Sequence, residues 1–205
     1  MKKIIILSLA ILTLCTSVVY AKSDNEIKRT ETVTTSKAQT YKINFNDTEF
    51  ILKKSTNKTP NGEYVNEYYK ENETPDNWTE MISVSELPKY QSSTMDYAEM
   101  ILSVDHSPNN YDRPVTMNSK TDKVTFVYLL RGKQGDVRHI DFNAMQVLPY
   151  KNRKGIKCVQ YSRKHLYTNR EEYLSGFNAI ETDKTKYFNL VKDMEMPELI
   201  KKDIN

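Results

Sequence analysis

The feature that most constrains this chain is an almost unbroken apolar run, Val124-Thr125-Phe126-Val127-Tyr128-Leu129-Leu130. Most of its residues are β-branched or aromatic, and no charged residue interrupts it. Such a run predicts a central strand that is covered on both faces. Because a sheet must bury its apolar surface against another layer, we expect helices to cover at least one face of the sheet.

Other segments alternate between apolar and polar residues and are separated by turn signals, which predicts further strands. The turn signals are Asn46-Asp47, Pro60-Asn61-Gly62 and Pro75-Asp76-Asn77, and Gly132 and Gly135 are expected to bracket another turn. With the apolar run, the predicted strands cover residues 41–45, 49–53, 63–70, 79–84, 124–130, 137–148 and 156–167. Short connections favour antiparallel pairing. In such a sheet, an acidic and a basic side chain on neighbouring strands can form an ion pair.

Two segments have helical periodicity instead. Ser93 and Asp96 have the spacing of a capping box, and an apolar stripe follows them at Tyr97, Met100, Ile101 and Val104. Thr168 and Glu171 form a second such pair, before residues spaced by three, four or seven positions: Tyr173, Phe177, Ile180, Tyr187, Val191 and Met194. This C-terminal segment is one long helix or two in sequence, and Pro197 is expected to stop it.

The predicted fold is therefore α+β. We expect a single domain over residues 40–196, with a mainly antiparallel sheet of about six to seven strands. A mid-chain helix and a C-terminal helical segment cover that sheet. Residues 22–39 are predicted to be a flexible polar leader, and residues 197–205 a polar tail.

The first 21 residues have the pattern of a cleaved secretory signal peptide. Lys2 and Lys3 precede an apolar run over residues 4–14, and Val19-Tyr20-Ala21 fits a cleavage site. The sequence thus predicts export to the periplasm or the medium. Cleavage removes Cys15 and leaves Cys158 alone, so an intramolecular disulfide is excluded. A lone cysteine in an oxidising compartment is expected to be buried and inert.

The residues carry little evidence for catalysis. Only five glycines occur in 205 residues, and the phosphate-binding, nucleophile-elbow and zinc-protease motifs are missing. We predict no catalytic residue, no cofactor and no metal site. One alternative is a metal site in which His139 and Asp141 on one strand meet His165 from its partner strand. Solvated polar side chains on a strand face are the stronger interpretation. Cys158 and His165 lie about 23 Å apart on an extended strand and cannot form a catalytic pair.

Charge is distributed unevenly along the chain. Residues 63–105 hold ten acidic and two basic side chains, whereas residues 131–165 hold nine basic and two acidic ones. Either the molecule is electrically bipolar and steers partners, or these segments are neighbours and neutralise each other. The predicted partner-binding residues are the basic turn Lys151, Arg153, Lys154 and Lys157, and the strand face with Tyr64 and Tyr68. The basic turn would suit an acidic partner or anionic lipid headgroups.

One stretch with a tryptophan, PDNWTEMISV, precedes the first predicted helix, and KCVQYSRKHLY precedes the second. In this order of elements, over about residues 40–195, the chain resembles small secreted bacterial domains with a Mog1/PsbP-like α/β/α sandwich. The resemblance implies a non-enzymatic assembly or accessory factor, and it carries over no catalytic residues.

The sequence therefore favours an exported protein of the bacterial envelope that binds a protein partner. Two alternatives stay open: a periplasmic small-molecule-binding protein, and a secreted hydrolase whose site has no known motif. Nucleic acid is a poor partner for an exported chain with a formal net charge of only +3.

Overall fold

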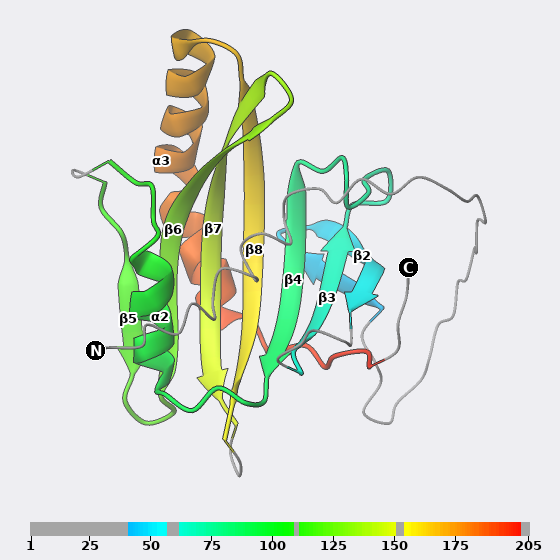
Figure 1. Cartoon of the computed structure of the whole chain (residues 1–205), viewed down its shortest axis with the longest axis vertical. Coiled ribbons are helices and arrows are strands. Elements are labelled where there is room, and N and C mark those ends of the chain that lie inside the picture. The colour runs from blue at the N-terminus through cyan, green and yellow to red at the C-terminus, as the bar shows by residue number, and fades with distance from the viewer. Residues whose placement is uncertain (1–40, 57–61, 109–110, 151–153, 202–205) are drawn as a thin grey trace, which may run out of the picture. The chain divides into compact units, whose positions relative to one another are not determined.

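The computed structural model describes residues 41–56, 62–108, 111–150 and 154–201. The predicted signal peptide and the whole of the predicted polar leader lie outside the described residues. The described part of the chain forms one antiparallel sheet and two helices, which confirms the α+β class (Figure 1). The sheet has eight strands, so the expected count of six to seven was too low.

The strands in chain order are β1 (Lys42–Phe45), β2 (Thr48–Thr56), β3 (Tyr64–Tyr69), β4 (Glu80–Leu87), β5 (Val115–Asn118), β6 (Lys123–Gln134), β7 (Val137–Pro149) and β8 (Ile156–Tyr167). Across the sheet their order is β1-β2-β3-β4-β8-β7-β6-β5, and every neighbouring pair is antiparallel. The strand that the sequence analysis missed is β5. It has four residues, all exposed, and its alternation of apolar and polar residues is too short to indicate a strand.

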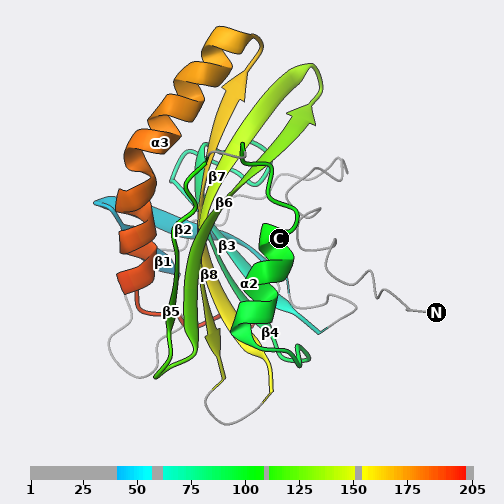
Figure 2. The same cartoon turned by 90° about the vertical axis from the view of Figure 1, so that its left-hand side faces the viewer.

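The two helices lie on opposite faces of the sheet. α2 (Thr94–Leu102) connects β4 to β5, and α3 (Arg170–Asp193) follows β8. Figure 2 shows α3 on one side of β6, β7 and β8 and α2 on the other side. We name the two sides of the sheet the α2 face and the α3 face. Neither helix of the described residues combines the length and the apolar character needed to cross a membrane.

The apolar run in β6 is buried on both faces, as predicted. Residues 124–129 are at most 3% exposed, and their side chains alternate between the α2 face and the α3 face. The strand is not central, however, because only β5 lies between it and the edge of the sheet. A short edge strand and a helix on each side are enough to exclude water from it.

The predicted capping box of α2 is confirmed, since Ser93 and Asp96 each bond to the other's backbone N–H. For α3 the cap is one residue later than expected. Asn169 accepts from the Glu172 backbone N–H, while Thr168 donates to the Glu172 carboxylate. Of the two alternatives for this segment, one long helix is correct. It ends at Asp193, where Met194 is already extended, before the chain reaches Pro197.

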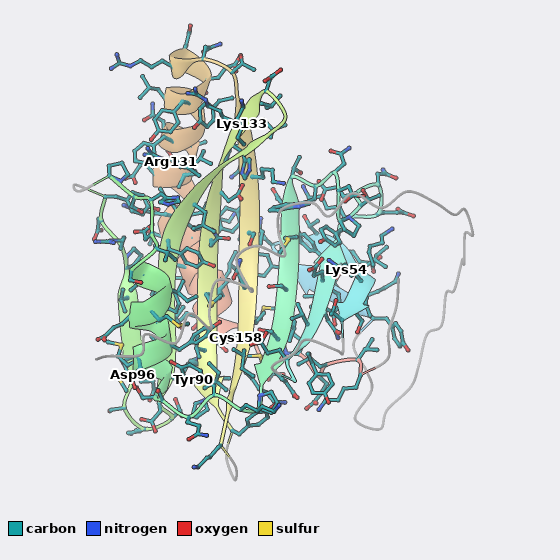
Figure 3. All side chains as sticks on the ribbon, viewed as in Figure 1. Lys54, Tyr90, Asp96, Arg131, Lys133 and Cys158 are labelled. Carbon is teal, nitrogen blue, oxygen red and sulfur yellow. The ribbon has the colours of Figure 1, made fainter. Side chains whose placement is uncertain are left out.

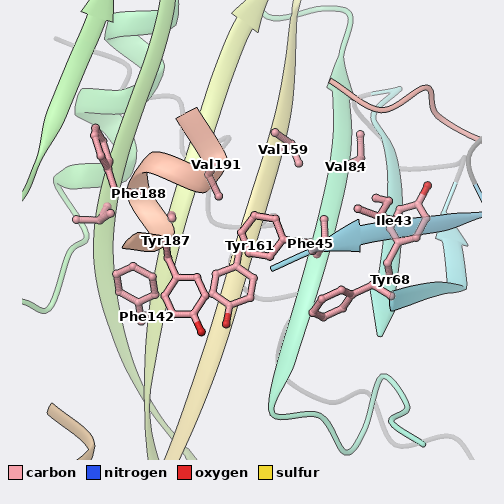
Figure 4. Packing of buried hydrophobic residues seen from close by; sticks show 14 of the residues in the cluster. Ile43, Phe45, Tyr68, Val84, Phe142, Val159, Tyr161, Tyr187, Phe188 and Val191 are labelled. Carbon is pink, nitrogen blue, oxygen red and sulfur yellow. The ribbon is translucent and has the colours of Figure 1, made fainter. Parts of the chain in front are cut away.

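The main core lies on the α3 face, where aromatic side chains from distant strands stack on the helix (Figure 4). The Tyr161 ring centroid lies 4.8 Å from that of Phe45 and 4.5 Å from that of Tyr187. Leu199 and Ile200 also belong to this core, at 5% and 0% exposure. They lie in the segment that the sequence analysis assigned to a polar tail, so the folded unit extends beyond residue 196.

Turn chemistry explains two of the hairpins. Asn46 and Asp47 both have positive φ, 49° and 60°, as a two-residue turn between right-twisted strands requires. Gly135 has φ 62° in the β6–β7 turn. Gly132, which we expected beside that turn, instead lies within β6 opposite His139.

Candidate functional site

The structure brings two of the predicted contact residues close together, because Tyr64 lies opposite Glu86 of β4 and Glu86 lies opposite Lys157 of β8. Lys151 and Arg153 lie outside the described residues, and Lys154 is exposed. Lys157 is bonded to Glu86, with Nζ 3.1 Å from Oε1. These positions leave the predicted partner contact of the basic turn untested.

The tyrosine strand offers less surface than expected. Tyr68 is fully buried on the α3 face, so its ring has no exposed area to present to a partner. Tyr64 is half-buried, with Lys201 Nζ 4.8 Å from its ring centroid. The alternation placed both rings on one face correctly, but that face is the core.

The oppositely charged segments of the sequence are neighbours in the sheet. β4 pairs with β8 so that Glu86 lies opposite Lys157 and Glu80 lies opposite Arg163. Both pairs are within ion-pair distance, at 3.1 and 4.0 Å. Arg163 also bonds to Asp183 of α3 at 2.8 Å. The alternative in which the charges pair across the sheet is therefore confirmed for these strands, and this part of the charge asymmetry does not form two separate poles.

The alternative metal site does not assemble. His139 Nδ1 lies 2.9 Å from Asp141 Oδ1, and both side chains are buried on the α2 face. His165 pairs with Ile140, which places it on the α3 face instead. Among the described residues, no group of three or more His, Cys, Asp or Glu side chains could hold a metal ion.

Cys158 is buried, as expected, and burial raises the pKa of its thiol to about 12. It lies on the α2 face of β8 (Figure 3). His165, seven positions further along the same strand, faces the opposite side of the sheet because side chains alternate. The structure therefore separates these two groups by face as well as by distance.

The sequence analysis missed a buried polar network on the α2 face. Asn143 Oδ1 accepts from Ser162 Oγ at 2.8 Å and from Gln160 Nε2 at 2.9 Å. Tyr128 donates to Gln160 Oε1 at 3.0 Å, which links β6 to β8 across β7. In the sequence these side chains resemble the solvated face of a strand. These side chains bond to one another, and the network therefore connects β6, β7 and β8 inside the protein.

A groove on the other side of the molecule has different properties. It lies between the β1–β2 turn and the C-terminal half of α3 and has a volume of about 540 Å³. Its apolar lining comes from Phe45, Leu190 and Met194. Its polar lining comes from Asn44, Asn46, Lys186, Asn189 and Asp193. We name this feature the asparagine groove.

The polar groups of the asparagine groove are available for binding. Asn44, Asn189 and Asp193 are exposed, and within the described residues their side chains have no hydrogen-bond or ion-pair partner. Free amides can donate and accept at the same time. Phe45 is held in place from below by its stack on Tyr161. The groove thus combines a fixed apolar wall with adaptable polar groups.

Main-chain groups extend the groove along β1. Tyr41 accepts from Leu52 N–H, and β1 pairs with β2 in an unbroken register. Since bonded pairs alternate in an antiparallel ladder, the N–H and C=O of Asn44 point away from β2. An extended chain lying along β1 would therefore meet the outward backbone groups of Asn44. Sequence alone could not identify this site, because β1 and α3 are more than 120 residues apart.

Comparison with known proteins gives one result. The model of a protein family matches residues 38–202, a range that includes all eight strands and both described helices, so the chain belongs to that family. No curated protein and no solved structure matched the chain.

Proposed function

We propose that this family member is an exported, non-enzymatic binding or accessory factor of the bacterial envelope. Export is supported by the signal pattern over residues 1–21. The observation that carries the binding function is the asparagine groove, in which unpartnered amides lie over an apolar wall beside a strand edge. Its partner, in this proposal, is a protein that presents an extended polar segment to the groove.

An extended peptide fits the groove better than other ligands of protein origin. Edge strands bind such peptides by adding a strand, with main-chain bonds for affinity and side-chain contacts for selectivity. Lys186 and Asp193, which lie seven residues apart on α3, offer one charge of each sign to the side chains of the peptide. The exposed Lys154 is retained as a second contact for an acidic partner or an anionic headgroup.

A small polar molecule is the second candidate, and the volume of the groove favours it. The groove has about 540 Å³, within the range of about 300–1,000 Å³ for ligand sites, but it is open to solvent and does not enclose a ligand. A hydrolase has less support, because the described residues bring neither Cys158 nor the His139–Asp141 pair next to a free partner for nucleophilic chemistry.

Site-specific photocrosslinking in the producing cells tests the proposal. A photoreactive amino acid replaces Asn189 in the groove, and in a matched variant it replaces Asn178. Asn178 is also exposed and lies on the same face of α3, about 16 Å away along the axis, at 1.5 Å per residue. We expect a discrete protein adduct from position 189 and none from position 178.

A second substitution connects the adduct to the strand edge. Asn44→Pro removes the outward N–H of β1, at an edge position where proline is tolerated, and should abolish the adduct. Equal labelling from positions 178 and 189, or an adduct that survives Asn44→Pro, would contradict the peptide proposal. If position 189 yields no protein adduct while purified polar metabolites raise the melting temperature, the small-molecule candidate is favoured.

A further inference from the structure

The edge of the sheet opposite the asparagine groove has a surface that the proposed function does not use. It is formed by β5, whose four residues are all exposed. Val115 is 38% and Met117 is 49% exposed, and they are two of the few large apolar side chains in the described part of the chain with this much exposure. Both side chains point to the α2 face, because Val115 pairs with Phe126 and Met117 with Val124.

Within the described part of the chain, the backbone groups on the outer side of β5 have no hydrogen-bond partner. Pro114 C=O accepts from Val127 N–H, so even-numbered residues of β5 bond inward to β6. The N–H and C=O groups of Val115 and Met117 must then point outward. Pro114 has no N–H, but an N–H at this position would point inward to β6. The outward donors at Val115 and Met117 are therefore both present.

Natural edge strands are usually protected by short length, charges, proline, bulges or covering segments, and β5 is short, with four residues. β5 contains no charged residue and no proline, and its register with β6 has no bulge. The other edge of the sheet differs. β1 exposes Lys42, which pairs with Glu49 at 2.9 Å, and buries its apolar residues Ile43 and Phe45. A second strand could therefore add to β5 without meeting a charge, a proline or a bulge.

One antiparallel register makes the sequence of β5 complementary to itself. If Thr116 lies opposite Thr116 of a second copy, Val115 lies opposite Met117 of that copy and their outward groups form four hydrogen bonds. The apolar side chains then cover each other on one face. Exposed Asp112 precedes the strand and exposed Lys120 follows it. Antiparallel pairing therefore brings each flank beside the oppositely charged flank of the other copy.

We propose that β5 pairs with β5 of a second copy of this chain, which joins the two sheets in a symmetric dimer. The partner is a second copy, because a two-fold arrangement pairs Val115 of each copy with Met117 of the other. The same arrangement places Asp112 of each copy beside Lys120 of the other. Four main-chain bonds and two apolar contacts make a small interface, so the dimer is weak and depends on concentration.

Disulfide trapping in the purified chain, with Cys15 replaced by serine, tests both the dimer and its register. Thr116→Cys places two thiols on the two-fold axis, in a pair with Cβ atoms about 4.5–5.5 Å apart, close to what a disulfide needs. Val115→Cys places its thiols two positions out of register, too far apart to bond. Asn44→Cys on β1 controls for random collision at an exposed edge. Native Cys158 does not compete, because it is buried.

We expect Thr116→Cys to form disulfide dimers at least about tenfold faster than Asn44→Cys or Val115→Cys, because pairing raises the local concentration of its thiols. Sedimentation velocity of the wild type should show a dimer that grows with concentration. Met117→Lys should weaken it about tenfold or more, since it places a charge on each edge. A wild type that stays monomeric, with Thr116→Cys no faster than Asn44→Cys, would overturn the proposal. So would a dimer that Met117→Lys leaves unchanged.

Discussion

At the scale of single residues, Gly132 shows how a neighbouring side chain can exclude any residue larger than glycine. It lies in β6 directly opposite His139. A Cβ at this position would overlap the His139 Nε2 and Cε1 atoms. The imidazole therefore uses the space above a glycine, and from there its Nδ1 bonds to Asp141 at 2.9 Å. The glycine is required by the packing of a histidine and not by a turn.

Gly132→Ala should therefore lower the free energy of unfolding by about 1–3 kcal/mol, since His139 must move and a buried hydrogen bond breaks. In a His139→Ala background the same change should be neutral or stabilising, because alanine is favoured over glycine within a strand. Urea denaturation of the four proteins in this cycle measures the coupling. Equal costs in both backgrounds would show that the imidazole is not the reason for the glycine.

At the scale of elements, the outer edge of β6 shows how a strand is completed without a full-length partner. β5 pairs only with residues 123–126. Beyond it, Leu129 N–H donates to Asp105 Oδ1 at 2.7 Å, and Leu129 C=O accepts from His106 N–H at 2.8 Å. The carboxylate of Asp105 is fully buried and also bonds to Arg113 at 2.8 Å. A loop residue thus continues the edge of the sheet with its side chain.

Asp105→Ala should destabilise the protein by about 2–3 kcal/mol, because it leaves a buried N–H and a guanidinium without their charged acceptor. Asp136→Ala is the matched control. Asp136 is fully exposed in the β6–β7 turn and makes only a 3.6 Å contact with Lys133, so its loss should change stability by less than about 0.5 kcal/mol. Chemical denaturation compares the two, and similar costs would argue against the edge role of Asp105.

At the scale of the whole molecule, Glu86 joins three parts of the chain that are distant in sequence. Its β4 carboxylate is 2.9 Å from Lys201 Nζ of the C-terminal segment and 3.1 Å from Lys157 Nζ of β8. Burial raises the pKa of Glu86, but the hydrogen bonds from Lys201, Tyr150 and Lys157 outweigh it, and the net pKa is lowered. Nearby, Ser55 Oγ donates to the Ile200 carbonyl, which fixes the same C-terminal segment to β2.

A lowered pKa means that the ionised carboxylate stabilises the folded state. This contribution is present above the ordinary carboxyl pKa of 4.5 and is lost as the pH falls through the lower pKa of the folded protein. Glu86→Gln should therefore cost about 1–3 kcal/mol at neutral pH, with a gap to wild type that narrows in acid. Glu49→Gln, in an exposed pair with Lys42, should cost less than about 0.5 kcal/mol. A gap that is constant with pH would contradict this role for Glu86.

Local patterns were sufficient for most of the fold because they report local physics. Alternation and one apolar run identified seven strands, the capping box located the start of α2, and Asn46-Asp47 marked its hairpin. β5 was missed because its alternation spans only four residues, and Leu199 and Ile200 were assigned to a polar tail because two apolar residues form no periodic pattern. The resemblance to the Mog1/PsbP-like sandwich stays a prediction, as do export and an envelope partner.

The sequence by itself determined the α+β class, the antiparallel pairing and a strand covered on both faces, since hydrophobic period and turn chemistry act within a few residues. Only the tertiary structure decided what the charged and polar residues do. Strand order made Glu86 and Lys157 neighbours, and register placed His139 and His165 on opposite faces. The asparagine groove and the free edge of β5 likewise depend on which distant segments meet. A one-dimensional pattern does not contain that information.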